Sequence, residues 1–195
     1  DFGLNIRWLE RDALLEVIPD LNPRNLIGGT YSPNDGSASP LLSAHAFYTR
    51  AEERGARFHF GERVTGIISR RGKVVGVRTD RGGYATETVI NAAGPWARTA
   101  AEMAGLHVPV TPDSHEAGIT EPVEHFLDPM VVDLRPAEGS KNYYFYQHGT
   151  GALVFCITPE PPIVGTDRRE TSEFLPMIAP RMVGLMPKLA NVRIR

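Results

Sequence analysis

Residues 87–96 read Glu-Thr-Val-Ile-Asn-Ala-Ala-Gly-Pro-Trp, and the expected fold follows from this stretch. The apolar pair at 89–90 predicts the end of a strand. Gly94 and Pro95 then predict a tight turn before a helix over residues 96–104. Small residues in such a turn let backbone N–H groups approach a phosphate or a ribose at the positive end of the helix dipole. The stretch therefore predicts a strand, a nucleotide-binding turn and a helix in succession.

A helix and a set of strands precede this stretch. Ser39 predicts an N-cap, with Pro40 at the first position of a helix that runs to Arg54 and ends at Gly55. Four apolar residues at helical spacing predict its buried face: Leu41, Ala44, Tyr48 and Ala51. The segments 56–60, 63–70, 73–79 and 84–90 read as strands, and the last three form an antiparallel meander joined by glycine-containing turns.

The first forty residues predict less regular structure. Residues 7–18 read as a short helix that stops before Pro19, and residues 20–31 read as a loop. Residues 33–36, Pro-Asn-Asp-Gly, are typical of a turn.

The second half of the chain predicts a mostly antiparallel sheet. Short apolar segments alternate with turns that contain proline or glycine, at 108–110, 118–120, 130–134, 142–147, 152–157 and 163–165. Residues 173–185 predict a helix, although Pro176 and Pro180 interrupt its pattern. Residues 191–195 begin a further strand. The chain is therefore expected to be mixed, α+β (α/β), with both antiparallel sheet and helices.

The composition is that of an ordinary globular protein. Hydrophobic residues make up 42% of the 195 residues, charged residues 23%, and the formal net charge is −2. This balance gives no basic surplus for nucleic acid, and no apolar run is long enough for a membrane span. A single cysteine, Cys156, excludes an internal disulfide and a cysteine-rich metal site, so the expected compartment is the cytoplasm.

The chain resembles the FAD-dependent oxidoreductases of the D-amino-acid oxidase class. Residues 89–96 resemble the family's segment in wording, and three further elements occur in the family's order: residues 26–36, the helix 40–54 with Gly55, and the pair 64–67 and 76–79. The wording is similar to that of glycine oxidase, sarcosine oxidase beta-subunit and dimethylglycine dehydrogenase relatives.

The resemblance also implies an internal fragment. No Gly-x-Gly-x-x-Gly occurs in the 195 residues, and the family carries it at the end of its first strand. It is expected upstream of Asp1, and the segment that returns to the flavin is expected downstream of Arg195. The implied domains are a linker and flavin-approach segment over 1–40, the second part of an FAD-binding Rossmann-like domain over 41–107, and a truncated substrate-binding antiparallel-sheet domain over 108–195.

The resemblance implies the cofactor contacts. Val64 matches the meander valine whose backbone meets the adenine, and the alternative is a plain buried strand valine. Ala93, Gly94 and Trp96 match the segment near the adenosine and pyrophosphate; the alternative is a tight turn chosen for helix packing. Two further residues, Asp35 and Gly36, match the approach to the isoalloxazine, unless they form only a surface turn.

The substrate contacts are implied by the same resemblance. Tyr144 and Tyr146 would lie on one face of a strand that walls the substrate pocket, with Tyr144 the better match; the alternative is an aromatic sheet core. Asp167 stands where some amine-oxidising relatives place a histidine near the substrate, so the histidine's role does not carry over. No spacing of histidines predicts a metal site.

The implied reaction is oxidation of a C–N bond in a small amino acid or N-methylated amine such as glycine, sarcosine, dimethylglycine or proline, with FAD as cofactor. No catalytic residue is assigned. Three alternatives stay open: a dehydrogenase subunit that passes electrons to a partner, a glycerol-3-phosphate dehydrogenase-like enzyme, and a non-catalytic binding domain. Loss of a first parallel strand would expose sheet edges, which predicts association of the isolated chain into a homo-oligomer.

Overall fold

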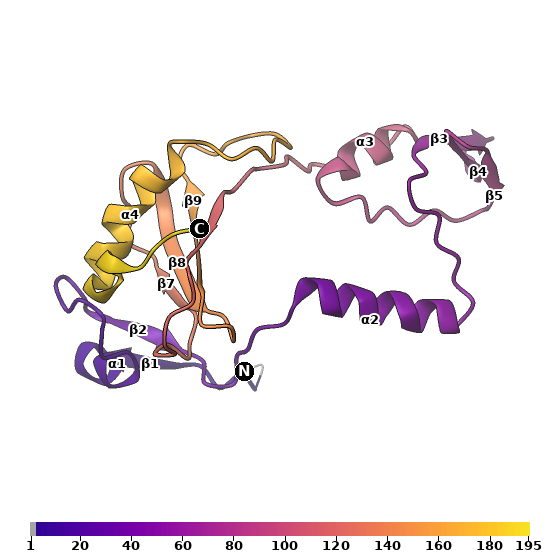
Figure 1. The fold of residues 1–195 in the computed structure, drawn as a ribbon. Coiled ribbons are helices and arrows are strands. Elements are labelled where there is room, and N and C mark those ends of the chain that lie inside the picture. Colours follow the sequence, from indigo (N-terminus) through magenta and orange to yellow (C-terminus); the bar gives the residue numbers. More distant parts are fainter. Residues whose placement is uncertain (1–2) are drawn as a thin grey trace. The chain divides into compact units, whose positions relative to one another are not determined.

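The computed structural model describes residues 3–195, which form two compact units (Figure 1). The sheet unit comprises the segment that ends at Ser37, with residues 113–163 and 167–195; the meander unit comprises residues 38–112 and 164–166. Antiparallel sheets and helices occur in both, which confirms the expected mixed fold. The domain boundaries expected near residues 40 and 107 stay predictions.

The sheet unit is built on a four-stranded antiparallel sheet. Its strands are β6 (Ala117–Ile119), β9 (Leu153–Pro159), β8 (Ser140–Gln147) and β7 (Val131–Asp133), in that spatial order. The central pair β8–β9 carries the longest register, from Ser140 opposite Pro159 to Gln147 opposite Leu153. Four of the six strands expected in this half are thus present. The other two expected segments, 108–110 and 163–165, do not form strands.

Helix α4 (Phe174–Leu185) covers one face of this sheet and is followed by the 3-10 helix η2 (Pro187–Asn191) (Figure 1). Its buried stripe consists of Phe174, Ile178, Met182 and Leu185. Burying each such side chain stabilises by about 1.5–3 kcal/mol, which together outweighs the roughly 3 kcal/mol cost of a proline inside a helix. The helix therefore forms over nearly the expected range despite Pro180.

The core of the sheet unit lies between α4 and the sheet. It combines side chains from the N-terminal segment, β8, β9, α4 and η2: Ile18, Leu21, Leu127, Tyr143, Phe145, Leu153, Phe155, Ile157, Phe174, Ile178, Met182, Leu185, Met186 and Leu189. Because Ile18 and Leu21 belong to this core, the N-terminal segment is part of the packing of the sheet unit.

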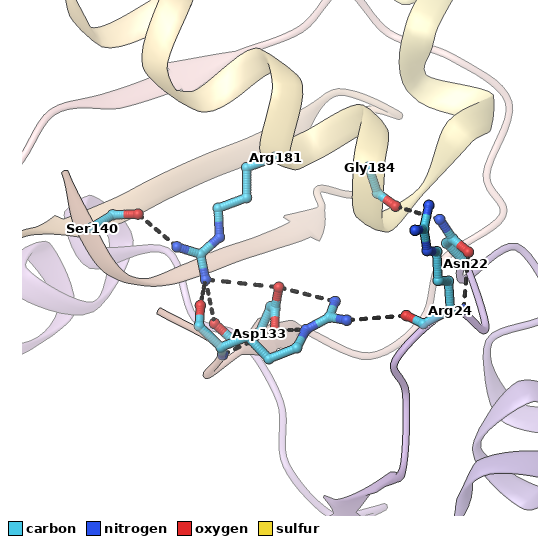
Figure 2. Close-up of polar contacts among 7 residues, drawn as sticks. Asn22, Arg24, Asp133, Ser140, Arg181 and Gly184 are labelled. Carbon is cyan, nitrogen blue, oxygen red and sulfur yellow. Dashed lines mark hydrogen bonds and ion pairs between the residues drawn. The ribbon is translucent and has the colours of Figure 1, made fainter. Parts of the chain in front are cut away.

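A polar network fastens α4 to the edge of the sheet (Figure 2). Arg181 of α4 donates to the Ser140 hydroxyl (2.6 Å) and to the Asp133 carbonyl (3.1 Å), and its guanidinium also bonds to the Arg135 carbonyl. At the end of α4, the Asn22 side chain donates to the Gly184 carbonyl (2.8 Å). The network therefore joins α4, β7, β8 and the N-terminal segment.

The N-terminal segment corrects two expectations. The helix expected over 7–18 begins only at residue 11: β1 (Arg7–Glu10) pairs antiparallel with β2 (Gly28–Tyr31), and α1 (Arg11–Val17) follows β1. Gly28, with φ +154°, allows this pairing, because a Cβ there would lie 2.4 Å from the Leu9 carbonyl oxygen. A strand partner distant in sequence thus overrides the local helical pattern, and part of the expected loop 20–31 becomes a strand.

The meander unit contains α2 (Pro40–Glu53), the sheet β3 (Val64–Arg70), β4 (Lys73–Thr79) and β5 (Gly83–Ala85), the 3-10 turn η1 (Gly94–Trp96) and α3 (Ala97–Glu102). The Ser39 hydroxyl accepts from the Leu42 N–H (3.3 Å), which confirms the expected N-cap. The order β3-β4-β5, antiparallel throughout, confirms the meander.

Four expectations for this unit are wrong. Segment 56–60 is not a strand, the strand expected over 84–90 ends at Ala85, and the helix expected over 96–104 is a six-residue helix after a 3-10 turn. The helix face expected to be buried is not: Leu41 (82%) and Ala44 are exposed, and Tyr48 and Ala51 are half-buried. Strands need hydrogen-bonding neighbours and apolar faces need cover, and residues 3–195 supply neither at these positions.

Candidate functional site

The two faces of the four-stranded sheet differ in exposure. Tyr143 and Phe145 of β8 are fully buried against α4, whereas Tyr144 and Tyr146 point to the opposite face and are half-buried. We call this opposite face the open face; the pairing register adds to it Val132 and Cys156 beside Tyr144, and Val154 beside Tyr146. The aromatic-core alternative therefore describes Tyr143 and Phe145, and the two tyrosines singled out from sequence share the open face.

The two open-face tyrosines differ in what their hydroxyls do. Burial, and a hydrogen bond to the Cys156 thiol, raise the pKa of Tyr144 to about 12, so its phenol stays neutral at physiological pH. The Cys156 thiol in turn donates to the Glu116 carbonyl (3.0 Å), and burial raises its pKa. Among residues 3–195 the Tyr146 hydroxyl has no hydrogen-bond partner. Tyr146, more than Tyr144, is therefore free to donate to a ligand on this face.

Asp167 lies in a loop of the sheet unit and is held by its own neighbour. Its carboxylate accepts from the Arg169 guanidinium (2.5 Å) and from the Arg169 backbone N–H (3.0 Å). The side-chain hydrogen bond from Arg169 is the largest cause of a pKa lowered to about 2, so the carboxylate is ionised throughout the physiological range. No contact joins it to either open-face tyrosine among the described residues. Asp167 is thus bound to a residue of its own loop, as an anchor of that loop would be. Its lowered pKa does not suit a general base.

Asp35 and Gly36 follow a surface turn of the sheet unit. The Asp35 N–H lies 3.4 Å from the Ser32 carbonyl, at the long end of hydrogen bonding, and both residues are exposed. A Cβ on Gly36 would meet nothing within 4 Å. The structure places both residues in open surroundings that leave their backbone accessible.

Val64 begins β3, the edge strand of the meander. It lies opposite Thr79, whose N–H is turned away from β3 to the Gly82 carbonyl (2.8 Å), while Asp80 N–H donates to the Arg63 carbonyl (2.9 Å). Hydrogen-bonded and non-hydrogen-bonded pairs alternate along antiparallel strands, so the Val64 N–H and C=O point out of the free edge. Val64 is 42% exposed in this structure, and its role at the cofactor stays a prediction.

Ala93, Gly94 and Trp96 form a turn in the same unit. The Asn91 side chain accepts from Ala93 N–H (3.2 Å) and donates to the Ala97 carbonyl (2.8 Å), so one amide braces both ends of the turn. Gly94 has φ +52°, a conformation that favours glycine, and a Cβ there would meet nothing within 4 Å. Trp96 is 54% exposed. The turn thus presents open backbone, although it precedes a helix too short for a strong dipole.

Three structural residues were not singled out from sequence. Asn91 braces the turn, Glu62 is a buried carboxylate beside the meander, and Gln147 clamps residues 123–127 by accepting from Phe126 N–H (2.8 Å) and Leu127 N–H (3.1 Å). An asparagine two residues before a small-residue turn is a recognisable signal. Glu62 and Gln147 carry no local signal, because their partners lie far along the chain.

Two classes of site are absent over residues 3–195. None of the helices there has both the length and the apolar character needed to cross a bilayer. No group of three or more histidine, cysteine, aspartate or glutamate side chains in this range has the geometry to hold a metal ion.

Comparison with known proteins gives one family. The family model described as "FAD dependent oxidoreductase" (DAO) matches residues 1–195. Mitochondrial dimethylglycine dehydrogenase of Homo sapiens is 31% identical over 147 residues, covering 74% of this chain and 17% of that protein. Hydrogen cyanide synthase subunit HcnC of Pseudomonas aeruginosa is 28% identical over 192 residues, covering 97% of this chain and 44% of that protein.

Among solved structures, L-proline dehydrogenase from P. horikoshii superimposes with a TM-score of 0.87 at 28% identity, over 100% of this chain and 51% of that chain. The chain thus spans about half, or less, of the length of each of these three proteins.

Proposed function

Because the chain belongs to the DAO family of FAD-dependent oxidoreductases, we propose that it forms part of an enzyme that oxidises the C–N bond of a small amino acid or N-methylated amine. Relatives with this chemistry in their names, dimethylglycine dehydrogenase and L-proline dehydrogenase, support the substrate class. The one structural observation that carries the proposal is the open face, where Tyr146 offers a hydroxyl that has no hydrogen-bond partner among residues 3–195, beside aromatic and aliphatic side chains.

The residues present fit FAD in the meander unit. Val64 offers an outward N–H and C=O, a donor and acceptor pair that matches the adjacent ring nitrogen and amino group of adenine. Ala93 and Gly94 offer backbone without side-chain obstruction to the adenosine and pyrophosphate, with Trp96 beside them. In the sheet unit, Asp35 and Gly36 are proposed to approach the isoalloxazine ring. When bound, FAD supplies the two-electron acceptor for the carbon next to nitrogen.

The open face is proposed to orient the substrate and to exclude water from it. No lysine or arginine occurs among its defined side chains, so a carboxylate clamp is expected elsewhere in the protein. An amine bound in its neutral form supplies its own lone pair, and no general base from this chain is invoked. The ionised Asp167 is proposed only as a rim residue of the substrate site.

Two further readings stay with this proposal. One alternative is that the protein is a dehydrogenase subunit that passes electrons to a partner. The relative HcnC supports this alternative, because its name describes it as a subunit. A glycerol-3-phosphate dehydrogenase-like activity is the other alternative, and it requires phosphate-binding arginines in the complete site. A cytoplasmic location is proposed on the single cysteine alone.

The first test uses the protein from the complete reading frame. We expect a flavin absorption spectrum that bleaches without oxygen when one of glycine, sarcosine, dimethylglycine or proline is added. The rate at which oxygen then restores the colour separates an oxidase from a dehydrogenase. A colourless protein that added FAD cannot colour would contradict the proposal and favour a binding domain.

Replacing Tyr146 with phenylalanine tests the open face. The expected result is a 10- to 100-fold lower kcat/KM. The variant removes the hydrogen bond from the Tyr146 hydroxyl to a charged group of the substrate, and such a bond contributes about 1.5–3 kcal/mol. Tyr144→Phe should lower kcat/KM less, because the hydroxyl of Tyr144 interacts with the thiol of Cys156 on the neighbouring strand. Steady-state kinetics with the substrate identified above decide this.

Tyr143→Phe is the matched control, since it removes the same atom from the neighbouring residue on the α4 face. In the described part of the chain the Tyr143 hydroxyl is buried without a hydrogen-bond partner, so its loss should leave kcat/KM unchanged. Equal effects of Tyr143→Phe and Tyr146→Phe would remove the open face from the proposal.

A further inference from the structure

Glu62 is a buried carboxylate in a unit that has almost no apolar core. Within residues 38–112, Ala101 is the sole apolar side chain that is buried, yet the Glu62 side chain is only 8% exposed. Its oxygens accept from the Thr79 hydroxyl (2.5 Å) and from the Tyr84 hydroxyl (2.9 and 3.0 Å). One carboxylate therefore ties the entry of β3 to the end of β4 and to β5.

The hydrogen positions in this cluster follow from the acceptor. Tyr84 has one hydroxyl hydrogen and gives it to Glu62, so the His59 Nδ1 atom, 3.1 Å from the same oxygen, is assigned as the donor. The bond from Thr79 is the largest cause of a lowered Glu62 pKa, which keeps the carboxylate ionised. Each bond in the cluster thus has a donor and an acceptor.

The cluster lies beside one of the two irregularities in the pairing of β3 with β4. The ladder between β3 and β4 is irregular between Val64 and Gly66, where one extra residue, Thr65, enters β3. A slip by one residue would turn the Val64 N–H and C=O from the free edge toward β4. Thr79 is the residue opposite Val64, and Glu62 lies two residues before Val64 on the same segment. The hydrogen bond between Thr79 and Glu62 therefore fixes this register.

We propose that Glu62 is a positioning residue for the adenine end of FAD, because through Thr79 and Tyr84 it holds the Val64 backbone facing outward. The inference rests on the proposed function, in which the Val64 edge meets the adenine. Glu62 touches neither the flavin nor the substrate in this arrangement. Its effect is therefore on cofactor affinity and not on the chemical step.

The test titrates the apoprotein, from the complete reading frame, with FAD and with ADP as a competitor that carries only the adenine half. Glu62→Ala should weaken both FAD and ADP by about tenfold, the equivalent of one to two net hydrogen bonds, with kcat at saturating FAD unchanged. Glu62→Gln keeps an acceptor oxygen for Thr79 and Tyr84 and should bind within about threefold of wild type.

The matched control is Glu53→Ala in α2 of the same unit, where the carboxylate forms only an exposed ion pair with Arg50 (2.7 Å). It should leave both affinities unchanged. Should Glu62→Ala not fold, Tyr84→Phe removes the hydroxyl that bonds to Glu62 and His59, and it is expected to weaken FAD and ADP binding in the same direction.

The outcomes separate the two proposals. If folded Glu62→Ala bound FAD and ADP with wild-type affinity, the inference would be overturned and the proposed function would stand. The same holds for Tyr84→Phe if that variant has to replace Glu62→Ala. A lower melting temperature with unchanged affinities would likewise assign Glu62 a purely structural role. Failure of the wild-type protein to take up FAD would overturn the proposed function itself, and the inference with it.

Discussion

Asp133→Ala is expected to destabilise the sheet unit by about 3–5 kcal/mol, the range for removing one partner of a buried ion pair. The Asp133 side chain is 10% exposed and that of Arg181 is 9% exposed. Asp133 meets Arg135 at two points (2.8 and 3.2 Å) and Arg181 at 3.7 Å, so its loss leaves two guanidinium groups without their shared carboxylate (Figure 2). Urea unfolding of the purified protein measures the change.

A rescue variant and a surface control accompany this measurement. Asp133→Ala combined with Arg181→Met should recover most of the loss, because a buried charge network can be replaced by apolar groups of similar volume. Asp128→Ala removes a 95% exposed partner of His125, and an exposed pair contributes at most about 1 kcal/mol. If Asp133→Ala and Asp128→Ala behaved alike, the network would not be what fastens α4 to the sheet.

Phe155→Ala is expected to cost about 3–5 kcal/mol, as for other large-to-small changes in a close-packed core. Phe155 is fully buried, lies opposite Phe145 and stacks on Phe174 of α4 at 6.2 Å between ring centroids. Gly118 on the neighbouring strand makes room for the ring, since a Cβ there would lie 2.2 Å from it. The same urea titration reports the loss.

Val154→Ala is the control for this variant, because it is the preceding residue on the opposite, open face of β9. It is half-buried, so it should cost much less than Phe155→Ala, about 1 kcal/mol. It should instead alter the KM of the substrate if the open face is the substrate wall. Comparable destabilisation by the two variants would contradict the assignment of α4 and the core to a single face of the sheet.

Local chemistry determined several features that could be read from the sequence. The N-cap at Ser39 needs only the hydroxyl and the following proline. The turn at Arg71-Gly72 was indicated by Gly72, which adopts φ +75°; both features are in the structure. The alternation in β8 likewise separated Tyr143 and Phe145 from Tyr144 and Tyr146, because successive side chains of a strand point to opposite faces.

Features that depend on a distant partner were not predictable. Residues 7–10 carry a helical pattern and yet form a strand, because Gly28–Tyr31 pairs with them. Segments 56–60 and 86–90 carry strand-like patterns and form none, because no strand among residues 3–195 pairs with them. Glu62 and Thr79 are 17 positions apart and Asp133 and Arg181 are 48 positions apart, and no local pattern marks either contact.

The sequence by itself determined the turn at Ala93 and Gly94 and the alternation of the aromatic strand, because each rests on residue types and spacings that are local. It also determined the antiparallel meander and the family, because several such short segments follow one another in a recognisable order. Only the tertiary structure decided which face of that strand α4 buries. It also decided, within residues 3–195, which of two tyrosine hydroxyls stays unpaired and which backbone edge Val64 leaves free. Those properties depend on which segments pack and pair across the fold. The free energy of such a contact depends on both residues at once, and these residues are far apart in the sequence.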